Sequence, residues 1–201
     1  LSYDLAHNRL FVTAAVLQPP VLDMGQPLAA QYGSFGAMVG HELTHAVDNK
    51  GRRIDAAGSL RDWWSPTTAA AWDARIAPLA GVYSSFAYPG NATLKVDGAR
   101  TYKENAIDLS GLELAWSAFE KAEQQATAAN QQPFFRGWAR LWAQHLSPQA
   151  AGTHAAFSPY PPGQWRANAP AMQLPVFGKA FACKTGNAML VPEAQQLSIW
   201  R

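Results

Sequence analysis

Two histidines and a glutamate interrupt an otherwise apolar stretch in "VGHELTHAVD", residues 39–48. Apolar residues recur at helical spacing through residues 31–49, and Gly51 follows where helices commonly end, so we predict a helix here. On that helix His41 and His45 lie one turn apart and project from the same face. The imidazoles are therefore either buried polar groups with local partners or ligands of a metal ion.

The histidine spacing favours zinc. Two imidazole nitrogens about 2.0–2.1 Å from one ion are ordinary zinc geometry. Glu42 directly follows the first histidine, which makes it an unfavourable third ligand but a suitable base for a metal-activated water. A catalytic zinc needs a third protein ligand and an open fourth position. A further ligand is therefore expected downstream.

Two carboxylates in "KENAIDLSGLELAW", residues 103–116, are the candidates for that ligand. Glu104 and Asp108 share one face of a predicted helix that is otherwise apolar, where burial is costly unless a cation or hydrogen bonds compensate. We expect Glu104 to be the third ligand and Asp108 to accept the outer N–H of a ligand histidine. Asp48 is expected to do the same for His45; the alternative is an exposed residue at the helix end.

Composition excludes some classes of protein. The chain has 201 residues, enough for one domain, and a net charge of +2 without a run of Lys or Arg, so nucleic acid is not an expected partner. No apolar stretch is long enough for a transmembrane helix. Cys183 is the single cysteine, which excludes an internal disulfide and a cysteine-based zinc site. The 8 Trp and 14 Pro indicate either ordered loops or a surface that another segment covers.

Hydrophobic patterns outline the remaining elements. Asp97-Gly98 lies between extended segments in residues 92–104 and predicts a hairpin turn. Residues 146–201 are rich in Pro and Gly and show little periodicity. The other predicted elements are a short strand within residues 9–18, a helical stretch over 66–85 that carries Pro78, and helices over 103–127 and 133–145.

Longer segments carry a family resemblance. "GHELTHAVDNKGRRIDAAGSLRDWW", followed by "KENAIDLSGLELAW", resembles the neprilysin and endothelin-converting enzyme family of zinc endopeptidases, and "VLQPP", "PPGQWR" and "FACK" resemble it in the same order. The resemblance implies a mainly α fold with a small β component, of the thermolysin-like zinc peptidase type. It also implies that residues 1–201 form a single catalytic domain, the C-terminal part of a longer two-lobed enzyme whose N-terminal lobe closes the substrate chamber.

Residue roles follow from the resemblance by position. It implies one zinc ion held by His41, His45 and Glu104, with Glu42 as catalytic base and Asp48 and Asp108 as the carboxylates behind the histidines. It further implies that Arg166 holds a substrate carbonyl and that Met38 and Trp142 line the pocket for the residue after the cut bond.

One position departs from the family pattern. The family usually has a histidine six residues before the arginine, where it stabilises the oxyanion, whereas this chain has Tyr160 in "SPYPPGQWR". A phenol can also donate a hydrogen bond to an oxyanion, so the catalytic role can survive the exchange.

Three functional hypotheses follow. The first is a zinc-dependent endopeptidase that cleaves oligopeptides, exported to the periplasm or the extracellular space, with the N-terminal lobe of the same protein as a partner. The second, motivated by Tyr160, is a metal-retaining peptide-binding protein with weak or no turnover. The third is a structural subunit whose hydrophobic face docks on another chain. The presence of Glu42 argues against pure binding, because a structural zinc site has no use for a base there.

Overall fold

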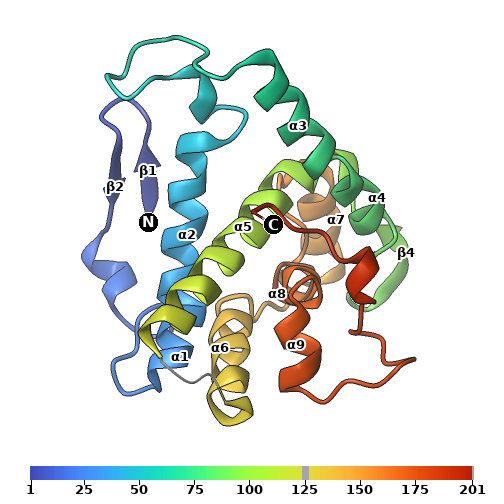
Figure 1. Ribbon diagram of the computed structural model, residues 1–201. Helices are drawn as coiled ribbons and strands as arrows, with labels where there is room; N and C mark the ends of the chain where they lie inside the picture. The colour runs from blue at the N-terminus through green and yellow to red at the C-terminus, as the bar shows by residue number, and fades with distance from the viewer. Residues whose placement is uncertain (124–126, 201) are drawn as a thin grey trace.

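A computed structural model describes residues 1–123 and 127–200. Within these residues the fold is mainly α, with two small antiparallel sheets, as the sequence predicts (Figure 1). The strands are β1 (Ser2–Asp4), β2 (Arg9–Phe11), β3 (Ala87–Tyr88) and β4 (Asn91–Lys95). The α-helices are α1 (Leu28–Gln31), α2 (Ala37–Thr44), α3 (Pro66–Ile76), α4 (Pro78–Ser84), α5 (Gly98–Ala122), α6 (Ala128–Leu141), α7 (Pro148–Phe157), α8 (Gly163–Met172) and α9 (Pro175–Ala180).

The helix predicted over 31–49 is observed as a continuous rod in which α-helical, π-helical and 3-10 segments follow one another. A π-helical turn, Tyr32–Gly36, joins α1 to α2, and a 3-10 turn, His45–Val47, follows α2. The rod ends because the backbone of Asp48 is extended, while its side chain accepts hydrogen bonds from the N–H groups of Lys50 and Gly51 at 2.7 and 2.8 Å. The carboxylate thus satisfies donors at the turn that follows the helix.

Helices α2 and α5 cross at two glycines with almost no space between their backbones. A Cβ atom on Gly40 would lie 2.7 Å from the carbonyl oxygen of Gly111, and a Cβ on Gly111 would lie 2.6 Å from both the Ala37 oxygen and the His41 nitrogen. Figure 1 shows α5 running diagonally across α2. Only glycine allows this approach, which brings the histidine helix and the carboxylate helix together.

We expect Gly111→Ala to destabilise the protein by about 3 kcal/mol, because the new methyl group meets backbone atoms of α2 that cannot rotate away. Chemical denaturation measures the loss. The matched control is Gly81→Ala in α4, where a Cβ meets nothing within 4 Å and helix propensity improves by about 0.5–1 kcal/mol. Equal stability of Gly111→Ala and the parent would show that the helices can separate without cost.

The predicted hairpin at Asp97-Gly98 is wrong. The Asp97 side chain instead accepts a hydrogen bond from the backbone N–H of Arg100 at 3.0 Å and caps the N-terminus of α5. Gly98 is needed for packing, since a Cβ there would lie 2.0 Å from the Ala80 oxygen of α4. Asp-Gly suits both a turn and a helix start, and the contact with α4 decides between them. The observed hairpin pairs β3 with β4 across Pro89-Gly90.

Other boundaries also differ from the predictions. Proline divides the stretch over 66–85 into α3 and α4, as its missing N–H predicts. The described residues after 146, which lack a clear period, contain three short α-helices, and two of them start with a proline at their first position. The remaining changes are a strand shortened to Arg9–Phe11 with a 3-10 turn at Ala14–Leu17, and helices shifted from 103–127 to Gly98–Ala122 and from 133–145 to Ala128–Leu141.

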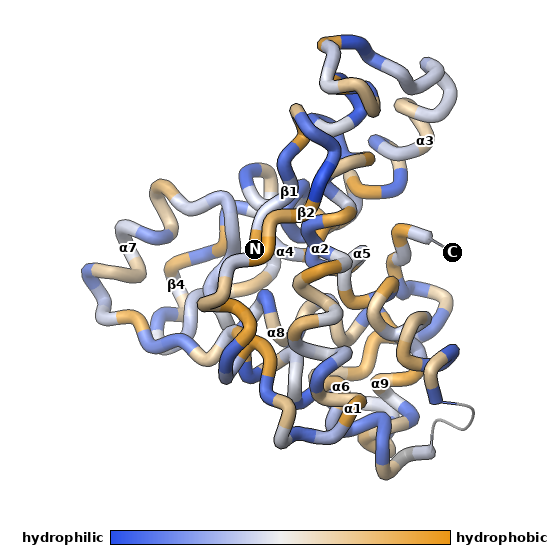
Figure 2. The backbone as a smooth tube through the Cα atoms, turned by 90° about the vertical axis from the view of Figure 1, so that its left-hand side faces the viewer, coloured by the Kyte–Doolittle hydropathy of each residue, from blue (hydrophilic) through white to orange (hydrophobic). Residues whose placement is uncertain are grey.

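The hydrophobic core surrounds α5, and its part between α5, α6 and α9 is aromatic. Trp116 and Phe119 of α5 contact Phe134 of α6 at ring-centroid distances of 5.0 and 6.0 Å, and Phe135 contacts Phe177 of α9 at 5.1 Å. Hydrophobic residues also occur in β2 and the segment after it (orange in Figure 2), and among them Phe11 and Leu17 are each 49% exposed. Among the described residues, none of the helices combines the length and the apolar character that crossing a membrane requires.

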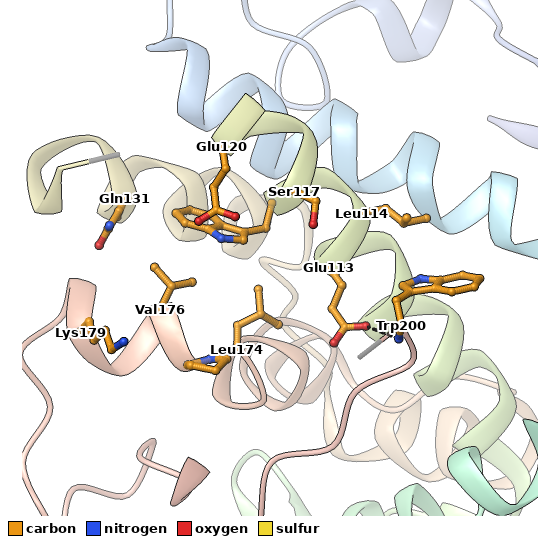
Figure 3. A pocket seen from close by; sticks show the side chains of 11 residues that line it. Glu113, Leu114, Ser117, Glu120, Gln131, Leu174, Val176, Lys179 and Trp200 are labelled. Carbon is orange, nitrogen blue, oxygen red and sulfur yellow. Dashed lines mark hydrogen bonds between the residues drawn. The ribbon is translucent and has the colours of Figure 1, made fainter. Parts of the chain in front are cut away.

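The C-terminal segment is tied to α5. Oε2 of the buried Glu113 accepts hydrogen bonds from the backbone N–H groups of Ile199 and Trp200 at 2.9 and 3.3 Å. Figure 3 shows Glu113 and Trp200 at one end of a pocket whose other walls come from α5, α6 and α9. This contact holds the end of the chain against the helix that carries Glu104.

Candidate active site

His41, His45 and Glu104 converge on one point. Each offers a ligand atom, and these atoms all lie within 4.8 Å of one another. Nε2 of His45 is 4.0 Å from Oε2 of Glu104, and the two imidazole rings meet edge to face at 5.0 Å. Among the described residues, this buried Oε2 has no hydrogen-bond partner. Two imidazoles and an unsatisfied buried carboxylate oxygen suit a divalent cation, so the donor set fits zinc.

Two aspartates hold the outer nitrogens of the histidines. Nδ1 of His41 lies 2.8 Å from Oδ1 of Asp108, and Nδ1 of His45 lies 2.8 Å from Oδ2 of Asp48. The pairing assigns the proton to Nδ1 in each ring and leaves both Nε2 atoms free to face Glu104. Asp48 is buried, so the alternative of an exposed helix-end residue is wrong.

Charges and hydrogen bonds set the ionisation of these groups. Burial alone would raise the pKa of Asp108, but the Arg166 guanidinium and His41 outweigh it and lower that pKa to about 2. Burial likewise opposes the ionisation of Asp48, yet His45 and two backbone N–H groups leave its pKa below the usual value. For His45, burial lowers the pKa, but Asp48, Glu104 and Glu42 raise it on balance.

Arg166 of α8 lies between two aromatic rings and a carboxylate. Its Nε and Nη2 donate to the two oxygens of Asp108 at 2.8 and 2.7 Å, and the fork leaves Nη1 for another acceptor. Its guanidinium carbon lies 3.6 Å from the ring centroid of Trp142 and 4.1 Å from that of Tyr160. This aromatic sandwich restricts the arginine to one position beside the cluster.

Tyr160 therefore contacts the site through its ring, which lies against the Arg166 guanidinium. Burial raises the pKa of its phenol to about 12, and the negative charge of Glu104 adds to this effect. The phenol consequently remains a neutral hydrogen-bond donor across the physiological pH range. His154, a nearby histidine in sequence, is not among the converging residues; its Nδ1 lies 3.0 Å from the hydroxyl of Tyr88.

Glu42 and Met38 complete the set of residues singled out in the sequence. Both lie on α2 and are partly exposed, Glu42 between the two histidines and Met38 one turn before His41. Met38, His41 and His45 follow helical spacing and share one face. Among the predicted residues, the structure brings His41, His45 and Glu104 together. Three residues from the C-terminal third of the chain reach the site through Asp108, which binds Arg166, and Arg166 in turn contacts Trp142 and Tyr160.

A buried chain of hydroxyl groups was not predicted. Nε1 of Trp200 donates to Ser110 Oγ at 2.8 Å, Ser110 lies 2.6 Å from Thr44 Oγ1, and Thr44 donates to the Gly40 oxygen at 2.7 Å. These hydrogen bonds link α2 to α5 close to the candidate metal ligands. They also link both helices to Trp200, near the C-terminal end of the described residues. The sequence offered one signal for this contact between the helices. A glycine inside an apolar helix indicates that another backbone approaches closely, and both helices contain one.

The fold and the cluster define a class of protein. A helix with two histidines one turn apart and a carboxylate between them, beside a second helix that contributes a further carboxylate, is the arrangement typical of the thermolysin-like zinc peptidase fold. The model of peptidase family M13 matches residues 2–197. The chain therefore belongs to peptidase family M13, a family of metallopeptidases and so of hydrolases, which confirms the resemblance to the neprilysin and endothelin-converting enzyme group.

Relatives of this chain carry peptidase names. It is 31% identical to Neprilysin-1 of Caenorhabditis elegans, over 93% of this chain and 26% of that protein. It is 29% identical to human endothelin-converting enzyme 1, over 98% of this chain and 26% of that protein. The chain thus spans about a quarter of the length of these relatives.

Solved structures agree with the fold. The crystal structure of PepO from Lactobacillus rhamnosis matches 99% of this chain and 31% of its own, with a TM-score of 0.89 and 31% identity. The zinc metalloprotease Zmp1 of Mycobacterium tuberculosis in its open state matches 100% of this chain and 32% of its own, with a TM-score of 0.91 and 30% identity.

Proposed function

We propose that this chain is the catalytic part of a zinc-dependent endopeptidase that hydrolyses peptide bonds in oligopeptides. The observation that carries the proposal is the convergence of His41, His45 and Glu104, with Glu42 on the same helix as the histidines. We assign these three residues to one zinc ion and assign Asp48 and Asp108 to orienting the histidines, which their 2.8 Å contacts support.

Glu42 acts as the general base in this proposal. When bound, zinc supplies Lewis-acid polarisation of the scissile carbonyl and lowers the pKa of a water molecule. The Glu42 carboxylate accepts a proton from the attacking water and passes it to the leaving amine. Its partial exposure on α2 supports the role, because the carboxylate remains accessible to substrate and water.

Arg166 and Tyr160 provide the donors for the substrate. With Nε and Nη2 held by Asp108, the Nη1 edge of Arg166 is left to donate to a substrate carbonyl oxygen. The Tyr160 hydroxyl donates to the oxyanion as the carbonyl becomes tetrahedral. Met38 and Trp142 line the pocket for the residue after the cut bond, and the stacking of Trp142 on Arg166 is compatible with that assignment.

The alternative is a protein that retains zinc and binds peptides with weak or no turnover, and Tyr160 is the residue that favours it. Metal analysis beside a fluorogenic peptide assay decides between the two. One equivalent of zinc with zinc-dependent cleavage supports the peptidase. Zinc with saturable peptide binding and no cleavage supports the alternative, and absence of zinc contradicts both.

Tyr160→Phe should lower kcat by about 10²–10³-fold with little change in zinc content, since it removes one oxyanion donor and no ligand. Because the pKa of the Tyr160 phenol is raised to about 12, the parent should show no alkaline loss of rate from this residue below that pH. Tyr160→His should introduce such a loss as the imidazole deprotonates near its ordinary pKa of about 6.5.

The test measures kcat as a function of pH for the parent, Tyr160→Phe and Tyr160→His. Full activity of Tyr160→Phe would mean that Tyr160 only holds Arg166 in place through ring stacking, which Phe preserves.

We propose further that the catalytic domain works within a longer polypeptide, in which an N-terminal lobe of the same protein covers the site. The share of the relatives' length that the chain spans supports this. Peptides are the proposed substrates, nucleic acid is not a proposed partner, and export to the periplasm or extracellular space is the proposed location.

A further inference from the structure

A pocket of about 590 Å³ opens beside the metal-site carboxylate. Glu104 forms part of its wall, and apolar side chains of Ile54, Trp72 and Ile107 also line it. It therefore adjoins the metal cluster directly, with the loop after α2 on one side and the first turns of α5 on the other.

Cations surround this pocket. Lys50 and Arg53 come from the loop after α2, and Arg100 and Lys103 from the first turns of α5. Arg100 is engaged by Asp97 at 3.2 Å and by the Ala155 carbonyl oxygen at 2.9 Å. Within the described residues, the other three have no carboxylate at ion-pair distance. A chain with a net charge of only +2 thus gathers unpaired cations at one pocket.

The two acids in the pocket wall do not neutralise these cations. Asp48 is used by Nδ1 of His45 and by the backbone N–H groups of Lys50 and Gly51. Glu104 is assigned to zinc, which would add positive charge. The pocket therefore presents a positive potential over an apolar floor, and a side chain with an aliphatic stem and a carboxylate end matches both.

The position of the pocket relates it to the cut bond. Met38, His41 and His45 follow one another along one face of α2, and the loop with Lys50 and Arg53 continues from the far end of that helix (Figure 1). If Met38 faces the residue after the cut bond, the basic pocket lies across the metal cluster from it. An extended peptide over the cluster then directs its residues before the cut bond toward the pocket.

We propose that this basic pocket selects substrates with an acidic residue, glutamate above all, on the N-terminal side of the cut bond. The proposal rests on the proposed peptidase function and names a substrate class for it. Lys50 and Arg53 are the specificity-determining residues, and Lys103 contributes charge from α5.

The test uses the zinc-loaded, full-length gene product that carries these residues. Internally quenched peptides differ only by Glu or Gln at each position before the cut bond. The parent should prefer Glu over Gln at one position by about two- to fivefold in kcat/KM, as exposed ion pairs permit. Lys50→Glu combined with Arg53→Glu should abolish or reverse the preference, and Lys103→Gln should reduce it.

The control is Lys179→Glu in α9, a single charge reversal of the same sign at an exposed residue outside this pocket, which should keep the preference. Equal rates for Glu and Gln peptides in the parent would overturn the proposal. So would a preference that survives the double variant, or one that Lys179→Glu weakens equally.

Binding separates this proposal from the peptidase function itself. Anisotropy of the labelled Glu and Gln peptides is measured on Glu42→Gln, which should bind without cleaving. Tighter binding of the Glu peptide, decreasing with ionic strength, supports the pocket even if the parent cleaves nothing. Identical affinities at low ionic strength contradict the pocket even if the parent is an active peptidase.

Discussion

Glu42→Gln should lower kcat by about 10²–10⁴-fold while zinc content and stability stay at the parent level. The amide has the size of the carboxylate but cannot accept the proton of the attacking water. Glu42 lies between His41 and His45 on α2 and is not among the converging ligand atoms, so its loss should leave the metal in place. Steady-state kinetics beside metal analysis by mass spectrometry measure both quantities.

The matched control is Glu120→Gln, the same exchange at an exposed position of α5 in the wall of a different pocket. It should leave kcat and zinc content unchanged. Loss of zinc in Glu42→Gln would make Glu42 a ligand, and retention of full turnover would assign the proton transfer to another group.

The two helices that carry the candidate metal ligands could be predicted because their sequence signals are local. Two histidines at one-turn spacing define a face, and Glu104 with Asp108 defines another, whatever the rest of the chain does. Carboxylates on an apolar helix face also require compensation, and that requirement indicates a cation and a histidine partner before any contact is known. The observed contacts of Asp108 with His41 follow this expectation.

The surroundings of Arg166 could not be predicted from pattern because they depend on packing between distant segments. Trp165 stacks on Phe86 at a centroid distance of 3.8 Å, and its Nε1 donates to the Ala87 oxygen. These contacts anchor α8 so that Arg166 reaches Asp108, yet they join residues nearly eighty positions apart. The region after residue 146 has no period that reveals them.

The turn at Asp97-Gly98 illustrates a second limit. Both residues favour a hairpin turn, and both also favour a helix start when the aspartate caps the first turn. The choice depends on α4, whose Ala80 oxygen leaves room only for a glycine. Such a close approach is a property of the assembled fold, so local preference alone selects the wrong structure.

Glu104→Ala should weaken zinc binding by about 100-fold or more, because the site keeps only His41 and His45. Hydrolysis should fall with the metal content. Competition with a chromophoric chelator measures the affinity, and thermal unfolding with and without zinc measures the linkage. The parent should gain stability from zinc, whereas Glu104→Ala should gain little at the same concentration.

The zinc-free proteins distinguish a ligand from a structural residue. Without a cation, the buried Oε2 of Glu104 has no hydrogen-bond partner among the described residues, so alanine should not destabilise the apo protein. Glu113→Ala on the same helix should do the opposite: it releases the backbone of Ile199 and Trp200 and lowers apo stability while zinc affinity remains. If Glu104→Ala keeps the parental zinc affinity, the third ligand must be another residue. If the variant loses only stability of the apo protein, Glu104 is a packing residue and not a ligand.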